Sequence, residues 1–487
     1  MKKIGIIGAG LSSLYAACHL AKNGYDVTVF EKNTMAGGRS QVFSAKGFTF
    51  DMGPSWYWMP DLIDALFNDL GEKREDYFAL QQLNPGYQVF WKDGSATAIP
   101  AQRSAITQLF ESLETGGGKS VDKFLADAKI KYDIATASFL ENPGLKWSEL
   151  FKVSVLKDAL KLDVFKSVEK DVSNRFRSEK AQSLLNFPVL FLGEMPGNIP
   201  SLYTLMNYAD LELGTWYPEG GMRAIAVALE KIAKNNGVTF HFNAAVESIR
   251  AENDRATGFV VNGEFYAFDA IVGGGDYHHI EQTLLPKNYR RYSESYWDAR
   301  KLAPSSLIFY LGIDKEIPGL EHHNLFFDED LTAHGKEIYD HPQWPTKPLF
   351  YVCAPSKTDK EVAPEGHENI FILMPLAPNL EDDESTRDSY FNLILDRMEK
   401  HCKTPIKEHV VFKRSFCVSD FKSEYNSYKG NAYGLANTIR QTANLKPKMV
   451  SKLPNVFYCG QLTVPGPGIP PALISGKIAA KQIVKSL

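Results

Sequence analysis

Apolar and polar positions fall into blocks at the start of the chain and predict a strand, a helix and a second strand. Residues 4–7 form an apolar run, as expected for a parallel strand buried on both faces. A glycine turn with Gly8 and Gly10 follows, then a helical pattern, and then a second apolar strand that ends at Glu31. The chain therefore begins with a βαβ unit.

Further strands and helices follow from the same kind of pattern. Residues 87–100 alternate around an Asp-Gly pair, which is a strong hairpin signal. Helical patterns dominate residues 101–210, and residues 307–312 and 370–375 are expected to form buried strands of a second sheet. A short apolar strand at 270–272 can rejoin the N-terminal sheet. We therefore expect the N-terminal unit to be discontinuous in sequence.

The first turn carries most of a dinucleotide-binding fingerprint. Gly8 and Gly10 let the backbone approach a pyrophosphate, and the helix after them presents unpaired N–H groups and the positive end of its dipole. Glu31 lies about 20 residues further on, the spacing at which a carboxylate binds ribose hydroxyls. Ser13 replaces the third glycine, which serves helix–strand packing. We predict dinucleotide binding, with an ordinary buried βαβ unit as the alternative.

A second glycine-rich strand-to-helix junction lies near the end of the chain. The apolar strand 456–459 leads to Gly460 and a Gly/Pro-rich loop, and a helix is predicted from residue 472 to the end. The start of that helix can face an anionic or electron-rich ligand. Alone, this segment is a proline-stiffened loop. Together with the first turn, it predicts contact with the far end of an extended dinucleotide.

Composition narrows the classes of function. A net charge of −4 over 487 residues gives no electrostatic case for nucleic-acid binding. The five cysteines show no CxxC spacing, so neither a metal site nor a disulfide framework is predicted, and a reducing cytoplasm is expected. We interpret the N-terminus as mature, and no apolar run of about 18 residues predicts a transmembrane helix.

Residues 145–170 alternate apolar side chains with lysines and acids, as in an amphipathic helix. Such a helix could lie on a membrane surface, or it could pack on a domain core with its lysines extended to solvent. Glu149 and Lys152 stand one turn apart in it. We consider a proton-handling role for this pair, beside the common alternative of a solvated ion pair.

Seven stretches along nearly the whole chain carry a resemblance to one family. They are IGIIGAG, MAGGRS, FTFDMGPSWYWMP, WYPEGGM, APEGHENIFILMPLAP, KGNAYGLANTIRQTA and FYCGQLTVPGPGIPPALISGKIAA. In content and order they resemble the bacterial-type phytoene desaturases, which are carotenoid-modifying FAD flavoproteins. Ser13 and the segment 273–276 (Gly-Gly-Gly-Asp) depart from the family pattern.

The resemblance implies an α/β fold with a discontinuous Rossmann-like FAD-binding domain and a mixed β-sheet substrate domain with a helical cover. The FAD domain would comprise residues 1–75, 215–285 and 425–487, and the substrate domain residues 76–214 and 286–424. The implied activity is FAD-dependent desaturation of CH–CH bonds in an acyclic C40 polyene, most simply phytoene towards lycopene. The protein would associate peripherally with membranes, and a quinone or oxygen would reoxidise the flavin.

The resemblance also assigns residues to the cofactor. Gly8 and Gly10 would hold the pyrophosphate, Glu31 the adenosine ribose, and Arg39 the region near the ring system. The full set of implied FAD contacts is Gly8, Ala9, Gly10, Leu11, Ser12, Ser13, Glu31, Lys32, Gly38, Arg39, Ser55, Val246, Gly460, Gly466, Pro467, Gly468 and Ile469.

A hydrocarbon substrate offers nothing to hydrogen-bond, so its site should be a long apolar channel. Candidate lining residues are Trp56, Tyr57, Trp58 and Met59, for which core packing is the alternative. Three other functions stay open at this point. They are desaturation of a hydroxylated or cyclised carotenoid, an amine or protoporphyrinogen oxidase-like activity, and non-enzymatic transport of prenyl lipids.

Overall fold

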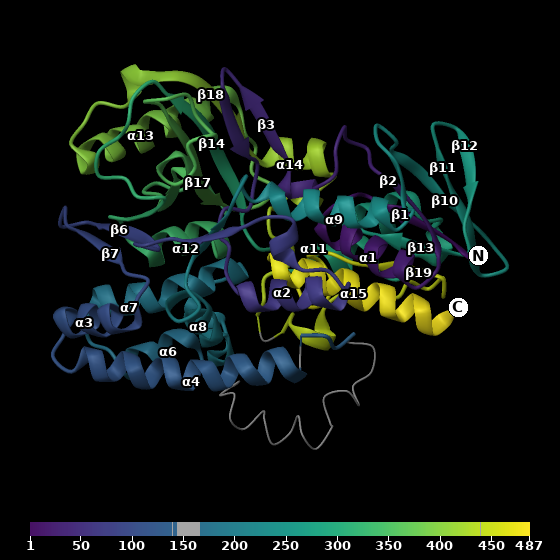
Figure 1. Cartoon of the computed structure of the whole chain (residues 1–487), viewed down its shortest axis with the longest axis horizontal. Helices are drawn as coiled ribbons and strands as arrows, with labels where there is room; N and C mark the ends of the chain where they lie inside the picture. Colours follow the sequence, from purple (N-terminus) through teal and green to yellow (C-terminus); the bar gives the residue numbers. More distant parts are fainter. Residues whose placement is uncertain (139, 144–165, 439) are drawn as a thin grey trace.

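The structure is a computed structural model that describes residues 1–138, 140–143, 166–438 and 440–487 (Figure 1). The predicted amphipathic helix at 145–170, with Glu149 and Lys152, lies outside the described residues as far as residue 165. Within the described part, no helix is long and apolar enough to cross a membrane.

A five-stranded parallel sheet contains the N-terminal βαβ unit. Its strands, in spatial order, are β19 (Val456–Tyr458), β13 (Ala270–Gly273), β1 (Lys3–Ile7), β2 (Asp26–Phe30) and β9 (Thr239–His241). Ile4 of β1 pairs with Ala270 on one side and with Val27 on the other. The prediction that the strand at 270–272 rejoins the N-terminal sheet is therefore confirmed.

Both faces of this sheet are covered, which explains its apolar strands. Helices α1 (Leu11–Lys22), α2 (Pro60–Asp69), α9 (Arg223–Asn235) and α15 (Ile469–Ser486) share one core with it. Helix α15 begins earlier than predicted, because prolines are tolerated in a first turn, whose N–H groups need no helical partner. An antiparallel sheet covers the other face with strands β10 (Val246–Glu252), β11 (Arg255–Val261) and β12 (Glu264–Ala267).

A second, seven-stranded mixed sheet forms the other half of the molecule. Its order is β18 (Val410–Phe416), β14 (Ser305–Ile313), β17 (Glu368–Leu376), β16 (Phe350–Cys353), β15 (His323–Phe327), β6 (Tyr87–Trp91) and β7 (Ala96–Ile99). The hairpin predicted at 87–100 and the two strands predicted at 307–312 and 370–375 are confirmed.

The two faces of this sheet have different neighbours. Leu307, Phe309 and Leu311 of β14 pack with helix α13 (Glu384–Cys402) in one core. Ile308 and Tyr310 belong to a second core, which is rich in aromatic side chains. The helices that cover this second face are α3 (Arg103–Leu113), α4 (Gly117–Ser138), α6 (Val168–Ser173), α7 (Glu179–Asn186) and α8 (Leu205–Leu211) (Figure 1).

The remaining elements are short. The paired strands are β3 (Val42–Ala45) with β4 (Phe48–Asp51), and β5 (Leu80–Gln82) with β8 (Trp216–Pro218). The other helices are α10 (Tyr277–His279), α11 (Glu294–Asp298), α12 (Leu331–Tyr339) and α14 (Val418–Tyr425). Single-turn segments include η1 (Gly38–Ser40), η2 (Arg74–Asp76), η4 (Phe187–Leu192), η5 (Pro196–Asn198), η6 (Ser201–Thr204), the π-helical η7 (Ile280–Leu284), η8 (Lys287–Tyr289), η9 (Pro355–Lys357), η10 (Lys407–His409), η11 (Tyr428–Gly430) and η12 (Ala443–Leu445).

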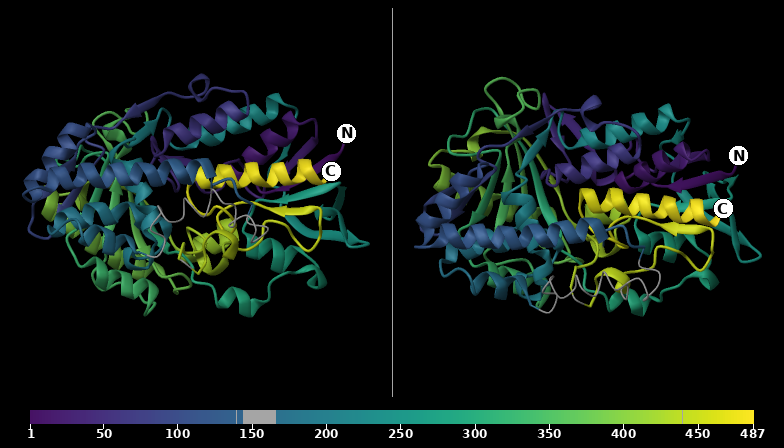
Figure 2. Two further views of the ribbon diagram at one scale, coloured as in Figure 1. Left: turned by 90° about the horizontal axis from the view of Figure 1, so that it is seen from below. Right: turned by 60° about the horizontal axis from the view of Figure 1, so that its bottom comes forward.

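The two chain ends lie close together at one end of the molecule (Figures 1 and 2). Lys2 Nζ donates a hydrogen bond of 2.7 Å to the carbonyl of Leu487. Helix α15 packs directly on α1, and a Cβ added to Gly476 would collide with the backbone of Ser12. The two glycine-rich segments singled out in the sequence are thus held side by side.

Candidate active site

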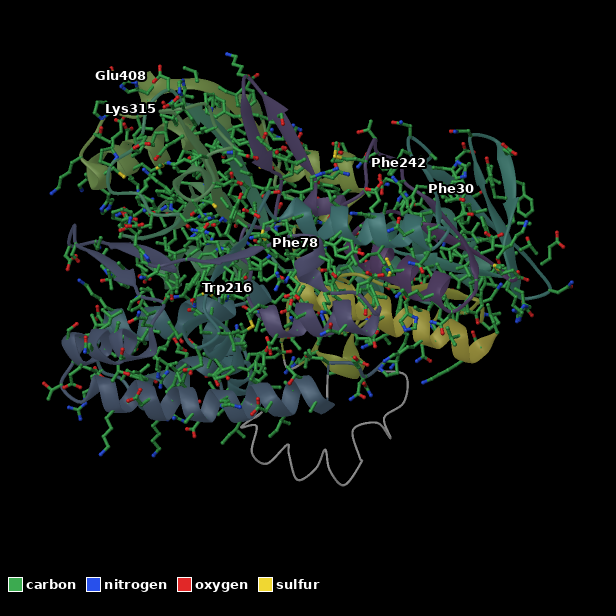
Figure 3. The ribbon with its side chains drawn as sticks, in the orientation of Figure 1. Phe30, Phe78, Trp216, Phe242, Lys315 and Glu408 are labelled. Carbon is green, nitrogen blue, oxygen red and sulfur yellow. The ribbon has the colours of Figure 1, made fainter. Side chains whose placement is uncertain are left out.

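A cavity of about 550 Å³ lies between the two large sheets. At one end it is lined by the loops that follow β1 and β2, and at the other by strands β14, β15, β16 and β17. Phe30, at the end of β2, lies on the parallel-sheet side, far from Lys315 and Glu408 at the opposite end of the molecule (Figure 3). The lining residues come from both halves of the molecule, so the cavity lies between them.

The first turn is shaped to admit a phosphate group. Gly8 adopts a φ of +88°, which glycine tolerates best, and its N–H donates to the Phe30 carbonyl at 2.8 Å. Gly10 caps helix α1 and offers no side chain to its N–H groups, and a Cβ at this position would meet open space. An anion at this point would satisfy the first-turn donors and face the positive end of the helix dipole.

Glu31 is buried at the edge of this turn. Its Oε2 accepts a hydrogen bond of 2.7 Å from the Ala9 N–H, and its Oε1 accepts one of 2.9 Å from the Asn33 N–H. Burial raises the pKa of the carboxyl, and these two backbone donors oppose the rise. Glu31 and Val246 both line the cavity.

Arg39 lies deeper in the same wall. Its Nη2 donates to Ser427 Oγ at 3.2 Å, while its buried Nε has no partner among the described residues. Burial lowers the pKa of Arg39 and raises that of Asp276, which also lines the cavity. Attraction between the two side chains partly offsets both shifts.

The C-terminal loop closes this end of the cavity. The N–H of Gly460 donates to Ser475 Oγ at 3.0 Å, and Gly468, with a φ of +109°, caps helix α15. Residues 467–472 line the cavity. Gly466 lies behind them, next to the buried Lys446 ammonium, and is not part of the lining.

The aromatic loop forms the wall between the two ends. Trp56, Tyr57, Trp58 and Met59 all line the cavity, as does Ser55. Trp56 is half-buried and stacks on His323, with ring centres 4.1 Å apart and planes inclined by 13°. Trp58 is anchored by its Nε1, which donates to Thr215 Oγ1 at 2.8 Å.

Beyond this loop the lining is almost entirely apolar. It includes Phe187, Leu190, Phe191 and Leu192 of η4, with Met195, Met206, Leu325, Phe327 and Leu373. The carboxylates among the described lining residues are those of Glu31, Asp276 and Glu424, which come from the segment after β2, the segment after β13, and α14. An extended dinucleotide fits the first end, and an apolar molecule fits the second.

Comparison with known proteins agrees with this geometry. A family model described as flavin containing amine oxidoreductase matches residues 9–484. The chain is 36% identical over 486 residues to the carotenoid 3,4-desaturase of Haloarcula japonica, covering 99% of this chain and 98% of that protein. It is 32% identical over 502 positions to a 4,4'-diapophytoene desaturase (4,4'-diaponeurosporene-forming) of Staphylococcus aureus strain Newman, covering 100% and 99% of the two chains.

The chain belongs to the flavin-containing amine oxidoreductases and, among them, to the carotenoid desaturases. An oxidoreductase from Methanosarcina mazei, 15% identical, shares the fold of this flavoprotein with a TM-score of 0.63, over 98% of this chain and 99% of that one. The flavoprotein is an FAD-dependent oxidoreductase with the predicted α/β fold.

The residues present in this flavoprotein fit FAD. The uncapped start of α1, the buried Glu31 carboxylate and the Arg39 side chain line one cavity, together with the start of α15. The buried Nε of Arg39 has no partner among the described residues. Most of the residues assigned to FAD line this cavity, namely Gly8, Gly10, Leu11, Ser12, Glu31, Lys32, Gly38, Arg39, Ser55, Val246, Gly460, Pro467, Gly468 and Ile469. Ala9, Ser13 and Gly466 are not among the lining residues, and Ala9 acts by binding Glu31.

Several lining residues were not singled out in the sequence. The run Phe187–Leu192 is entirely apolar and contains Pro188. This composition is unusual for a short helical segment, and it is the feature of the sequence that could have marked the run as a candidate lining segment. Tyr351 on β16 carried no local signal, because it reads as an ordinary buried strand residue. Only the pairing of β16 with its neighbours brings it to the cavity.

Proposed function

We propose that this flavoprotein desaturates an acyclic polyene, with phytoene towards lycopene as the first candidate reaction. The observation that carries the proposal is the continuity of the cavity from the dinucleotide end into the apolar compartment lined by η4 and the aromatic loop. The names of the two desaturase relatives support the same substrate class.

The chemistry divides between cofactor and protein. Bound FAD supplies the acceptor for the hydride that leaves one carbon of the substrate. Glu31 and the first turn would hold the dinucleotide, and Arg39 and the start of α15 would lie at its ring end. Trp56, Tyr57, Trp58 and Met59 orient the hydrocarbon and exclude water from the reacting carbons.

We also propose that residues 1–75, 215–285 and 425–487 form the FAD-binding domain. The strands of the parallel sheet, which all fall within these ranges, support this division.

An amine substrate fits this cavity less well than a polyene. An ammonium group needs a carboxylate or a comparable anchor once it is desolvated. The three lining carboxylates belong to elements around the dinucleotide end, so an amine in the apolar compartment would lie away from them. A protein that only carries prenyl lipids needs no dinucleotide-binding site, so the buried Glu31 and the two glycine-rich loops speak against this function.

Expression in a host that supplies phytoene as its sole carotenoid tests the proposal. Coloured products with additional double bonds are expected, and a Glu31→Ala variant should yield none because its flavin is lost. Unconverted phytoene in the presence of flavin-loaded protein would contradict phytoene as the substrate.

A second candidate is desaturation of an already coloured, hydroxylated or cyclised carotenoid. It is favoured by the identity of 36% with a protein named carotenoid 3,4-desaturase. Supplying lycopene and its hydroxylated derivatives to the same host separates the two candidates.

We further propose that the protein works at a membrane surface, where such substrates dissolve, and passes its electrons to a quinone or to oxygen. Sedimentation with lipid vesicles tests the first of these points.

A further inference from the structure

Tyr351 places a hydroxyl group at the wall of the apolar compartment. The residue lines the cavity, and its Oη donates a hydrogen bond of 3.0 Å to the Oγ of Ser55, which lines the cavity as well. The same Oη lies 2.6 Å from His323 Nδ1. A phenol and an imidazole are therefore joined in series, with the phenol nearer to the cavity.

His323 is fully buried behind this hydroxyl. Trp56 stacks on one side of its ring, and its Nε2 has no hydrogen-bond partner among the described residues. The titratable groups around it are His322, with ring centres 4.4 Å apart, Cys353, which is paired with it across β15 and β16, and Tyr351. Burial lowers the pKa of His323 well below its ordinary value and raises that of Cys353 to about 12, so the cluster is uncharged at neutral pH.

Two other titratable residues around the apolar compartment, His334 and Tyr57, are less suited to accept a proton. His334 also lines the cavity, but its Nδ1 accepts the Leu349 N–H at 3.0 Å and its Nε2 lies 3.1 Å from the Pro375 carbonyl. Both of its ring nitrogens are therefore occupied. The hydroxyl of Tyr57 is buried and has no partner among the described residues, so it has no base to which it could pass a proton.

We propose that Tyr351 is the proton acceptor of the desaturation and that His323 is the positioning residue that stores the proton. The inference rests on the proposed function. After the hydride has left one carbon, a C–H bond on the neighbouring carbon breaks and its electron pair becomes the new π bond. The Tyr351 hydroxyl first turns from Ser55 Oγ to His323 Nδ1, which requires His323 to carry its own proton on Nε2. The released proton then moves to Tyr351 Oη as the phenol's own proton moves to His323 Nδ1.

An uncharged pair is sufficient for this step. A proton beside an electron-deficient carbon is strongly acidic, so a neutral phenol backed by an imidazole can remove it. The resulting imidazolium is buried and unfavourable. Once the product has left the cavity, the imidazolium returns its proton through Tyr351 Oη to water that enters the cavity. A charged base at this point would have to be desolvated against a hydrocarbon, at a much greater energetic cost.

The test uses the FAD-loaded full chain and whichever carotenoid it converts. Tyr351→Phe and His323→Gln are each expected to lower kcat about 100-fold, as is typical when general-base catalysis is removed. Flavin content and carotenoid binding, measured by the absorbance shift of the bound polyene, should stay unchanged. The solvent deuterium isotope effect on kcat should rise in His323→Gln, because proton removal then limits the rate.

Tyr310→Phe is the matched control. Tyr310 is a buried tyrosine of the same sheet, its hydroxyl donates to the Met52 carbonyl at 2.7 Å, and it does not line the cavity. The Tyr310→Phe variant should lose about as much folding stability as Tyr351→Phe does, but it should keep the kcat of wild type. Equal kcat values for Tyr351→Phe and wild type would overturn the proposal, as would a loss of bound FAD or of polyene binding that accounts for the whole defect.

Two further outcomes separate rival explanations. His322, His323 and Cys353 offer donor atoms within 4.8 Å of one another, so a bound metal ion is a competing role for the cluster. A stoichiometric metal in the purified protein, with activity lost on chelation, would overturn the proton role. If wild-type protein converts no carotenoid at all, the proposed function fails, whereas an active wild type that Tyr351→Phe matches contradicts the proton proposal alone.

Discussion

Ser13 Oγ occupies the space that a Cβ on residue 274 would need, so Gly274 is compatible with Ser13 because it has no side chain. Ser13 stands where the dinucleotide fingerprint has a glycine, and Gly274 belongs to the other segment that departs from the family pattern. The two departures from the family pattern therefore form one packing contact, between α1 and the segment that follows β13.

This contact predicts coupling between the two positions. Gly274→Ala should destabilise the fold by about 1–3 kcal/mol, because an added methyl group overpacks a closed site. Ser13→Gly in the same chain should restore most of that loss. Denaturant unfolding of the two single variants and the double variant measures the coupling. Strict additivity of the two changes would show that the contact does not matter.

Glu31→Ala should yield a protein with little bound flavin. The carboxylate binds the Ala9 N–H and lines the cavity, so its loss removes both the support of the turn and the acceptor for a ribose. Glu31→Gln keeps an acceptor oxygen and should retain more cofactor. The ratio of flavin to protein absorbance gives the result. The exposed Glu252 on β10, changed to Ala, serves as the control.

Gly8 and Gly10 should respond differently to substitution. Gly8→Ala forces a side chain into a left-handed conformation and should cost about 1–2 kcal/mol of stability, even without cofactor. Gly10→Ser keeps a residue favoured at a helix start, and its Cβ meets open space, so the apoprotein should be as stable as wild type. Its hydroxyl competes for the α1 donors, so titration with FAD should show weaker binding.

Asp210 makes stability depend on pH. It is buried with the Tyr87 hydroxyl as its hydrogen-bond partner, and burial raises its pKa to about 8. Between about pH 4 and pH 8 the folded protein keeps a proton that the unfolded chain releases, so stability falls as pH rises, by at most about 1.4 kcal/mol per pH unit from this group.

Asp210→Asn removes this dependence and keeps an acceptor for Tyr87. Its Tm should exceed that of wild type at pH 8, with the difference shrinking towards pH 5. Thermal unfolding at both pH values measures it, and Asp26→Asn, at an exposed site, is the control. An advantage of the same size at both pH values would contradict the assignment to ionisation.

Trp56→Ala should weaken the binding of the polyene substrate and leave FAD content unchanged. The indole lines the cavity and stacks on His323, so its removal opens the apolar wall. A rise in KM of about tenfold is expected, equivalent to about 1.4 kcal/mol. Trp344 stacks on Tyr390 and does not line the cavity, so Trp344→Ala should leave KM as it is.

The local sequence determined the parts of the fold that depend on neighbouring residues. The turn at Gly8 and Gly10, the spacing to Glu31 and the strand-to-helix junction at Gly460 each follow from residue type and short-range spacing. Their chemistry is carried by backbone groups and by one carboxylate. The apolar strand 270–272 was also recognisable, because a strand buried on both faces reads as a continuous apolar run.

Tertiary structure alone decided what surrounds the reacting carbons. Tyr351, His323 and the η4 segment are distant in sequence and meet only through the pairing of β15 with β16 and the packing of η4 on the aromatic loop. Such contacts depend on register and side-chain packing over long sequence separations, which no local pattern encodes. The sequence thus determined where the two glycine-rich junctions and Glu31 stand, and the folded chain determined which hydroxyl lines the cavity and which imidazole lies behind it.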